Sequence, residues 1–274
     1  MTDIAVLQMT AGIDPAANAD TLEQAVAEAR ARGAAMLFTP EMSGLIDRDR
    51  ARAADKLMPE DEDLVLRRVR AAAAEHGLWV HIGSLAIRRA DGRLANRAYV
   101  IDDRGDIRAR YDKMHLFDVD LPSGESWRES ASYAPGEQAV VVDTPVGRLG
   151  LAICYDLRFP ALFAVLTEAG ATILSVPAAF TRPTGAAHWH VLLRARAIEA
   201  GVHLVAPAQT GDHQDGRATY GHSLVVGPWG EVLLDMGEAA GLGLATIDAG
   251  QVEAVRARLP AIRHRRTIGP VARA

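Results

Sequence analysis

Short apolar runs alternate with amphipathic segments along most of this 274-residue chain. Short runs of hydrophobic residues bounded by turn residues are typical of buried strands. Segments whose apolar residues recur three and four positions apart are typical of helices that cover such strands. The pattern predicts strands at residues 4–9, 35–38, 78–84, 148–153, 172–176 and 202–206.

Helical spacing occurs between most of these strands. In the first helical segment Leu22 and Ala29 share one face, and Asp20 stands where a helix cap is expected. Gly77 is expected to end the second helix, and Pro160 is expected to begin the third. The predicted helices lie around residues 22–29, 65–76, 160–168, 189–197 and 251–258.

The middle of the chain has a different pattern. Asp91–Gly92 and Asp103–Gly105 separate short apolar runs, as hairpin turns do. The stretch from Lys113 to Gly136 has little periodicity, and a loop of that length in a compact domain is often functional. Strand–helix alternation interrupted by hairpins predicts an α/β fold with mixed sheets, and no linker divides residues 1–274, so we expect a single domain.

Composition narrows the possible partners. Hydrophobic residues make up 49% of the chain, and 30 Lys and Arg against 35 Asp and Glu give a net charge of −5. A chain of this sign has no general attraction for nucleic acid or anionic lipid, so we expect neither as a partner. The basic group near Arg265 is small and suits a solvated tail or a subunit contact.

The sequence also indicates the cellular compartment of the protein and whether disulfides or zinc stabilise it. The first residues lack the pattern of a signal peptide, and the apolar run at 171–180 is too short to span a bilayer. Cys154 is the single cysteine, which excludes an internal disulfide and a zinc site built from thiolates. We therefore expect a cytoplasmic protein whose one thiol can stay reactive.

Cys154 lies where a predicted strand meets a predicted helix. The run Gly150-Leu-Ala-Ile leads up to it, and Tyr-Asp-Leu-Arg-Phe-Pro160 follows. Backbone N–H groups at such a junction are unpaired and can bind an oxyanion. The position suits a nucleophile, although most free cysteines are small buried core residues.

Two further residues are candidates for chemistry. Glu41 follows the strand at 35–38 and a proline, at the sheet edge where open α/β sheets bind ligands. Lys113 closes the hairpin region and opens the aperiodic loop. Viewed alone, each is more often a solvated surface charge.

Together, three segments resemble the signature motifs of the nitrilase superfamily of carbon–nitrogen hydrolases. They are Phe38-Thr-Pro-Glu41, Tyr111-Asp-Lys-Met-His-Leu-Phe117 and Gly150-Leu-Ala-Ile-Cys-Tyr-Asp-Leu-Arg-Phe-Pro160. The later stretches around Trp189, Tyr220-Gly-His-Ser223 and Pro228-Trp-Gly-Glu231 resemble the Nit-type amidase branch. Three motifs in the family's order, followed by a matching tail, make the resemblance specific over nearly the whole chain.

The resemblance implies a four-layer α-β-β-α sandwich that forms a homodimer or a larger homo-oligomer, with the tail from about residue 260 in subunit contacts. It implies a catalytic triad of Glu41, Lys113 and Cys154 that needs no cofactor and no metal. It also implies a second glutamate in the loop after the lysine, for which Glu129 fits and Glu125 is a rival.

These residue types suit amide hydrolysis. Cys154 would attack the carbonyl as a thiolate held by the positive charge of Lys113, and Glu41 would move the protons. For that task we expect burial to raise the pKa of Glu41. Lys113 and the backbone N–H of Tyr155 would stabilise the oxyanion, and Glu129 would orient the lysine or the substrate amide.

The implied substrate is a small amide that carries a carboxylate, as in a deaminated glutathione amidase or an ω-amidase. Arg158 could bind that carboxylate or could pair with an acid of the chain. Phe180, Thr184 and His222 are further candidates for the substrate pocket. Two departures from the Nit-type pattern, His190 in place of a glutamate and Ala161 in place of an acid, bear on the pocket or on subunit contacts rather than on the reaction.

Alternatives remain open on the sequence alone. A nitrilase, an N-carbamoyl amino acid amidohydrolase or a β-ureidopropionase would use the same triad, and a cysteine–histidine hydrolase could use His115. A catalytically silent member acting as an oligomeric interaction protein is the alternative of another class. His188 and His190 are two positions apart on a predicted helix and point to different faces, so they make a poor pair of metal ligands.

Overall fold

The computed structural model describes residues 1–120, 124 and 126–273. It contains two six-stranded sheets, with strand orders β16-β1-β2-β3-β4-β5 and β15-β14-β11-β10-β9-β8. Strand β1 is parallel to β2 and antiparallel to β16, while β11 is parallel to β10 and antiparallel to β14. Both sheets are therefore mixed, which confirms the predicted α/β class.

The elements follow the predicted order along the chain. The first sheet contains β1 (Thr2–Gln8), β2 (Met36–Phe38), β3 (Trp79–Arg88), β4 (Leu94–Ile101), β5 (Ile107–Asp112) and β16 (Gly241–Ile247). The second contains β8 (Val141–Thr144), β9 (Gly147–Leu151), β10 (Ile173–Ser175), β11 (His203–Ala206), β14 (Leu224–Val226) and β15 (Val232–Asp235). Two small ribbons pair β6 (Asp118–Asp120) with β7 (Ser126–Arg128), and β12 (Thr210–Asp212) with β13 (Ala218–Tyr220). The helices are α1 (Pro15–Ala31), α2 (Arg50–Ala54), α3 (Leu64–His76), α4 (Pro160–Glu168), α5 (Arg182–Ala200) and α6 (Ala249–Arg258).

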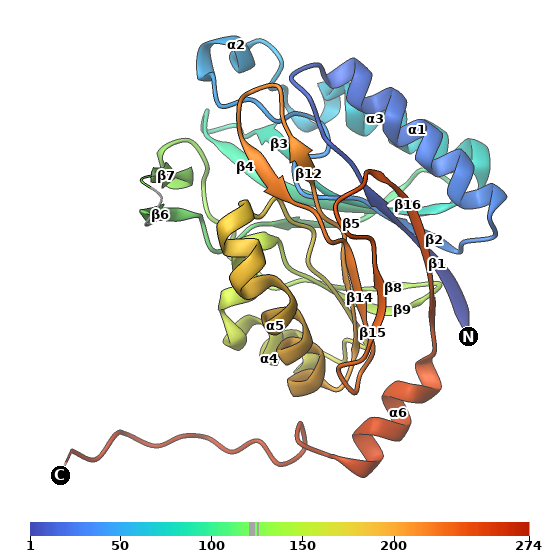
Figure 1. The fold of residues 1–274 in the computed structure, drawn as a ribbon, viewed down its shortest axis with the longest axis vertical. Helices are drawn as coiled ribbons and strands as arrows, with labels where there is room; N and C mark the ends of the chain where they lie inside the picture. Colours follow the sequence, from blue (N-terminus) through green and yellow to red (C-terminus); the bar gives the residue numbers. More distant parts are fainter. Residues whose placement is uncertain (121–123, 125, 274) are drawn as a thin grey trace.

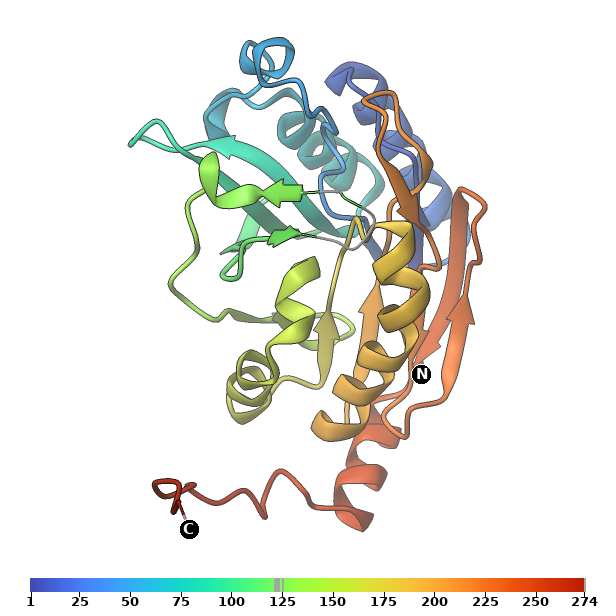
Figure 2. The same cartoon turned by 60° about the vertical axis from the view of Figure 1, so that its left-hand side comes forward.

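Helices cover the outer face of each sheet, and the two sheets face each other (Figures 1 and 2). Strand β1 shows the layering: Ile4 and Val6 belong to the core shared with the second sheet, whereas Ala5 and Leu7 pack in the cluster that contains α1 and α3. A strand buried on both faces is apolar at every position, which explains its continuous hydrophobic run. The result is the expected four-layer α-β-β-α sandwich.

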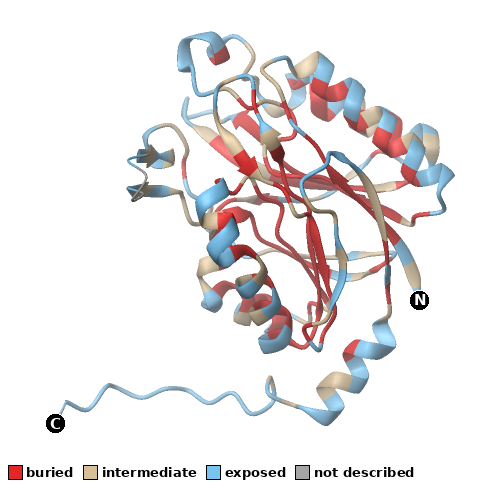
Figure 3. Cartoon of the chain, in the orientation of Figure 1, coloured by how far each residue is buried: buried red, intermediate tan, exposed pale blue. Residues whose placement is uncertain are grey.

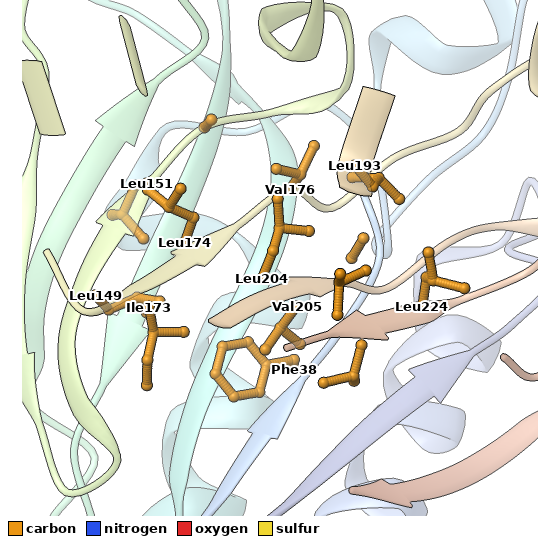
Figure 4. Close-up of a cluster of buried hydrophobic side chains, with 14 of the residues drawn as sticks. Phe38, Leu149, Leu151, Ile173, Leu174, Val176, Leu193, Leu204, Val205 and Leu224 are labelled. Carbon is orange, nitrogen blue, oxygen red and sulfur yellow. The ribbon is translucent and has the colours of Figure 1, made fainter. Parts of the chain in front are cut away.

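The core between the sheets consists mainly of aliphatic side chains, and Phe38 and Tyr111 are among its buried aromatic residues. Phe38 of β2 lies in one cluster with Leu149, Ile173 and Leu204 of the second sheet (Figure 4). Burial is concentrated in the strands and on the inner faces of the helices, as the red segments of Figure 3 show. The two sheets are therefore held at a fixed spacing, and loops at their ends can be positioned from both.

Helix boundaries agree with the capping signals, with one correction. Gly77 ends α3 in the left-handed conformation at φ 60°, and Pro160 is the first residue of α4, as predicted. The prediction of Asp20 as the cap of the first helix is wrong. The helix starts at Pro15, and the Asp14 carboxylate accepts a hydrogen bond from the Ala16 N–H at 2.9 Å. The first turn of this helix is not amphipathic. The spacing of apolar residues therefore predicted a start more than one turn beyond the observed one.

The chain after residue 260 runs away from the layered body (Figure 1). Arg265 pairs with Glu168 of α4 at 3.2 Å, and Ile268 and Val271 beyond it are exposed. The role of this tail in subunit contacts stays a prediction. Within the described residues, no helix combines the length and the apolar character needed to cross a bilayer.

Strand β3 passes unusually close to the segment that follows β2. A Cβ added at Gly83 would come within 2.1 Å of the Thr39 carbonyl oxygen and 2.5 Å of Pro40 O and Pro177 Cβ. The Gly83 N–H also donates to Thr39 Oγ1 at 3.1 Å. Only glycine fits here, and the contact sets the position of the backbone that leads to Glu41.

We expect Gly83→Ala to lower the free energy of unfolding by about 3 kcal/mol, because the added methyl group meets backbone atoms that cannot move independently. Urea denaturation followed by circular dichroism measures the change. The matched control is Gly269→Ala, which has no atom within 4 Å of the new methyl group and is expected to change stability by less than about 0.5 kcal/mol. Equal stabilities of the two variants would contradict the close approach.

Candidate active site

The ends of three strands bring the candidate residues to one cavity. Glu41 follows β2, Lys113 follows β5, and Cys154 follows β9 of the opposite sheet. All three line a cavity of about 770 Å³, together with Glu129 and Tyr155. Residues that are far apart in sequence therefore face the same cavity.

Cys154 lies at a strained turn between β9 and α4. Its φ of 50° is in the left-handed region, which a residue with a side chain seldom adopts, and such strain is found at functional sites. Its N–H donates to the Pro177 carbonyl at 2.9 Å, which ties the turn to the strand end beyond β10. Buried Asp156 accepts hydrogen bonds from the Ile153 N–H at 2.9 Å and from the Tyr111 hydroxyl at 2.7 Å. These bonds fix the turn that presents the sulfur to the cavity.

The residue after the cysteine supplies a free donor. The Tyr155 N–H makes no hydrogen bond to any described residue, while its neighbours Cys154 and Asp156 donate to Pro177 and Ile153. It lies in the first turn of the short 3₁₀ helix Cys154–Arg158, where backbone N–H groups are left without helical partners. The donor is thus available to an oxygen atom bound beside the sulfur.

Glu41 is buried and fully hydrogen-bonded. Its Oε1 accepts from Lys113 Nζ and from Asn96 Nδ2, both at 2.9 Å, and its Oε2 accepts from the Ala179 N–H at 2.9 Å. The Gln209 amide donates to its backbone carbonyl at 3.0 Å. Donors from both sheets therefore hold the carboxylate in one orientation.

Lys113 is 2% exposed and lies between two carboxylates. Its Nζ is 2.9 Å from Glu41 Oε1 and 2.9 Å from Glu129 Oε2. Glu129 also accepts from the Phe117 N–H at 2.6 Å and from Asn96 Nδ2 at 3.0 Å. The resemblance implied a second glutamate in this loop, and its assignment to Glu129 stays a prediction, because the rival Glu125 lies outside the described residues.

Each of the three groups has a shifted pKa. Burial alone raises the pKa of Glu41, but the Lys113 ammonium and the hydrogen bonds outweigh burial and lower it below its ordinary value. Burial lowers the pKa of Lys113, but the charges of Glu129 and Glu41 raise it well above its ordinary value. Burial and then the charge of Glu41 raise the pKa of Cys154 well above its ordinary value.

These directions favour a carboxylate, an ammonium and a neutral thiol in the free protein. This corrects two expectations from the sequence: the pKa of Glu41 is lowered rather than raised, and Lys113 does not hold Cys154 as a thiolate in the free protein. For Cys154 the reason is burial first and then the charge of Glu41, which together outweigh the ammonium of Lys113. For Glu41 it is the ammonium and the hydrogen bonds, which outweigh burial.

Arg158, Phe180 and Thr184 line the same cavity. The Arg158 guanidinium lies 5.6 Å from the Phe180 ring and 3.3 Å from His188 Nδ1. Arg158 forms no ion pair with any described residue; its guanidinium contacts His188 instead. The structure therefore does not show the expected alternative, in which Arg158 pairs with an acid of the chain. Its charge is available to the cavity.

The prediction that His222 lines the substrate pocket is wrong. His222 is absent from the described residues that line the cavity. Its imidazole stacks on Tyr220 with ring centroids 4.5 Å apart, and its Nδ1 lies 2.9 Å from Asp235 Oδ1. These contacts direct the ring toward the edge of the second sheet. His222 therefore does not contribute to the pocket that contains Cys154.

Three contributors were missed from the sequence: the amide of Asn96, the N–H of Ala179 and the carboxylate of Asp156. Asn96 gave a usable signal, because a lone buried amide in the apolar strand Leu94–Ile101 needs a polar partner. The Ala179 N–H gave none, since a backbone donor is independent of residue type.

Comparison with known proteins agrees with this geometry. The model of the carbon-nitrogen hydrolase family matches residues 3–257. A deaminated glutathione amidase of Yersinia enterocolitica is 37% identical over 269 residues, which is 97% of this chain and 93% of that protein. One from Bos taurus is 42% identical over 268 residues, which is 96% of this chain and 81% of that protein.

Solved structures have the same fold. The NitFhit protein of C. elegans superposes with a TM-score of 0.89 at 38% identity, over 97% of this chain and 65% of that one. A variant of an amidase from Nesterenkonia sp. AN1 has a TM-score of 0.79 at 30% identity, over 95% and 98% of the two chains, and carries acrylamide added to its active-site cysteine. The chain therefore belongs to the carbon-nitrogen hydrolase family, in the Nit branch of the nitrilase superfamily, and is a hydrolase of carbon–nitrogen bonds.

Proposed function

We propose that this enzyme hydrolyses a small carboxylate-bearing amide through a thioester on Cys154 and releases ammonia. The observation that carries the proposal is the buried group of Glu41, Lys113 and Cys154 at the wall of one cavity. The relatives named deaminated glutathione amidase support a substrate of that kind, with an ω-amide of a dicarboxylic acid as the related possibility.

In the first half-reaction the sulfur attacks the amide carbon. Because the Cys154 thiol is neutral at rest, its proton passes to the Glu41 carboxylate as the carbon–sulfur bond forms. The oxygen of the tetrahedral intermediate is stabilised by the Lys113 ammonium and the Tyr155 N–H. Glu41 then gives the proton to the nitrogen, the carbon–nitrogen bond breaks, and ammonia leaves.

In the second half-reaction water attacks the thioester. Glu41 takes a proton from the water, the carbon–sulfur bond breaks, and the sulfur recovers the proton as the acid leaves. Glu129 keeps Lys113 in position through its hydrogen bonds at 2.9 and 3.2 Å. Because its pKa is lowered, Glu41 is a carboxylate, and so can act as a base, across the neutral range. The carboxylate form is lost as the pH falls through this lowered pKa.

The charge of the cavity wall supports a carboxylate on the substrate. Beyond the three acids Glu41, Asp47 and Glu129, the described lining contains seven arginines: Arg48, Arg50, Arg88, Arg93, Arg128, Arg158 and Arg217. Arg158 is the one nearest in sequence to the nucleophile, and it has no acid partner among the described residues. We assign to it the substrate carboxylate, with Phe180 and Thr184 as neighbouring walls.

The alternatives fit the site less well. His115 stacks on Phe159 at 3.6 Å and binds Asp156 through Nδ1, and it is not among the described lining residues, which counts against a cysteine–histidine mechanism. A silent interaction protein would have no need of a buried ammonium between two carboxylates. Nitrilase, carbamoylase and ureidopropionase activities share the chemistry, and a panel of nitriles, ureido acids and amides with ammonia detection separates them.

Assembly and location form part of the same proposal. We propose a homodimer or larger homo-oligomer in which the tail after residue 260, with exposed Ile268 and Val271, contributes to subunit contacts. A reducing cytoplasm would keep Cys154 as a thiol.

Incubation with candidate amides followed by intact-mass measurement tests the thioester. We expect a mass increment equal to the acyl group, because deacylation by water is a separate step. Cys154→Ser is expected to remain folded, to show no increment and to lose about 10³-fold or more of the hydrolysis rate. Full amide hydrolysis by this variant would reject the assignment.

Glu41→Gln distinguishes the effect of Glu41 on the reactivity of the Cys154 thiol from its role in proton transfer. Because the charge of Glu41 is one cause of the raised pKa of Cys154, its removal is expected to lower that pKa and speed alkylation by iodoacetamide at neutral pH about tenfold. Amide hydrolysis is expected to fall about 10³-fold, since no group carries the proton to nitrogen. Alkylation that slows in parallel with hydrolysis would contradict this division of roles.

Arg158→Gln tests the substrate carboxylate. The loss of a charged hydrogen bond is expected to lower kcat/KM for a dicarboxylic ω-amide about 30-fold, mainly through KM, and to leave a neutral aliphatic amide within about threefold. Arg50→Gln on α2 removes a charge from the same wall and serves as the matched control. Equal losses in both variants would indicate a general field rather than a contact of Arg158.

A further inference from the structure

A second group of ionisable side chains lies outside the catalytic cavity. His190 is on α5, His222 precedes β14, and Asp235 is the last residue of β15. None of the three is among the described residues that line the cavity. Three separate segments therefore bring two imidazoles and a carboxylate together on the outer side of the second sheet.

The polar atoms of this group converge on one point. His190 Nε2 is 2.9 Å from Asp235 Oδ2, and His222 Nδ1 is 2.9 Å from Asp235 Oδ1. One ligand atom from each residue lies within 4.8 Å of the other two. In a tetrahedral zinc site, bonds of about 2.0 Å place neighbouring ligand atoms roughly 3.3 Å apart, so small side-chain rotations would complete the geometry.

The surrounding structure holds the ligand atoms in place before any ion arrives. His222 has a φ of 55°, one of three positive values among described residues other than glycine, and the other two are Met42 and Cys154 at the catalytic site. The Trp189 indole donates to the His222 carbonyl at 2.8 Å. The Gly237 N–H donates to Asp235 Oδ1 at 2.9 Å, which is the kind of support that orients metal-binding carboxylates.

We propose that His190, His222 and Asp235 bind one divalent transition-metal ion, of the Zn²⁺, Co²⁺ or Ni²⁺ class. Two imidazoles and one carboxylate suit these ions, whereas Mg²⁺ and Ca²⁺ prefer sites made of oxygen atoms alone. Partial exposure of the side chains, 32% for His190 and 33% for Asp235, leaves room for water as the remaining ligand. The site is separate from the cysteine chemistry, which needs no metal.

His188 and His190 alone make a poor pair of metal ligands, because they are two positions apart on α5. In the structure His188 lies beside Arg158, and His190 meets Asp235 and His222 from other segments instead.

Metal binding would tie α5 to the end of the second sheet. Trp189, next to His190 on α5, packs against Phe180 with ring centroids 4.8 Å apart, and Phe180 forms part of the cavity wall. An ion held by α5 and by the strand end would therefore restrain the outer layer behind that wall. The expected result is a more stable protein.

Calorimetric titration with ZnCl₂ at pH 7.5 tests the site, using full-length protein without a histidine tag and treated with chelator. The Cys154→Ser background removes the competing thiol from every sample. We expect one equivalent bound with a Kd of about 10 μM or tighter, and a Tm increase of roughly 5 °C at a hundredfold excess over Kd. Titration with CoCl₂ is expected to give visible d–d absorption from a site of low coordination number.

Variants decide whether these three residues are the ligands. His190→Gln and Asp235→Asn are expected to weaken Zn²⁺ binding at least about 30-fold and to abolish the Co²⁺ absorption. His188→Gln, two positions earlier on the same helix, is the matched control and is expected to bind as the parent does. Absence of binding up to 100 μM, or unchanged affinity in His190→Gln, would overturn the proposal and leave a metal-free hydrogen-bonded His–Asp–His group.

Discussion

The buried ammonium of Lys113 between Glu41 and Glu129 is the interaction on which the rest of the site depends. Removing a charged amine from water costs several kcal/mol, and two carboxylates at 2.9 Å repay that cost only with well-defined geometry. Asn96 adds hydrogen bonds to both carboxylates. Burial of the nearby Cys154 sulfur, and after it the charge of Glu41, raises the pKa of this thiol.

The two packed sheets provide the rigidity that such a cluster requires. Glu41 and Lys113 come from strand ends of one sheet, and Cys154 comes from a strand end of the other. A shift of one sheet relative to the other would therefore change the distance between the Cys154 sulfur and the Glu41 carboxylate. The apolar layer around Phe38 and the close backbone contact at Gly83 resist that shift, so packing away from the site helps to fix the positions of its side chains.

The sequence predicted the fold class, the order of most elements and the residues that the structure brings together around Cys154. It did so because strands buried on both faces have continuous apolar runs and because the motif residues follow strand ends. Prediction from the sequence failed for features that depend on neither residue type nor local spacing. The Ala179 N–H, the turn that directs His222 away from the pocket, and the charge balance that lowers the pKa of Glu41 all depend on segments that meet only in the folded chain.

The protonated state of the Cys154 sulfur has a further consequence for life in a changing redox environment. Peroxides attack thiolates far faster than thiols, and burial together with the charge of Glu41 raises the pKa of this cysteine. We therefore expect the sulfur of the enzyme without substrate to resist conversion to sulfenic acid. Under the proposed mechanism the sulfur loses its proton only as it attacks the amide, so the reactive form arises beside a bound substrate.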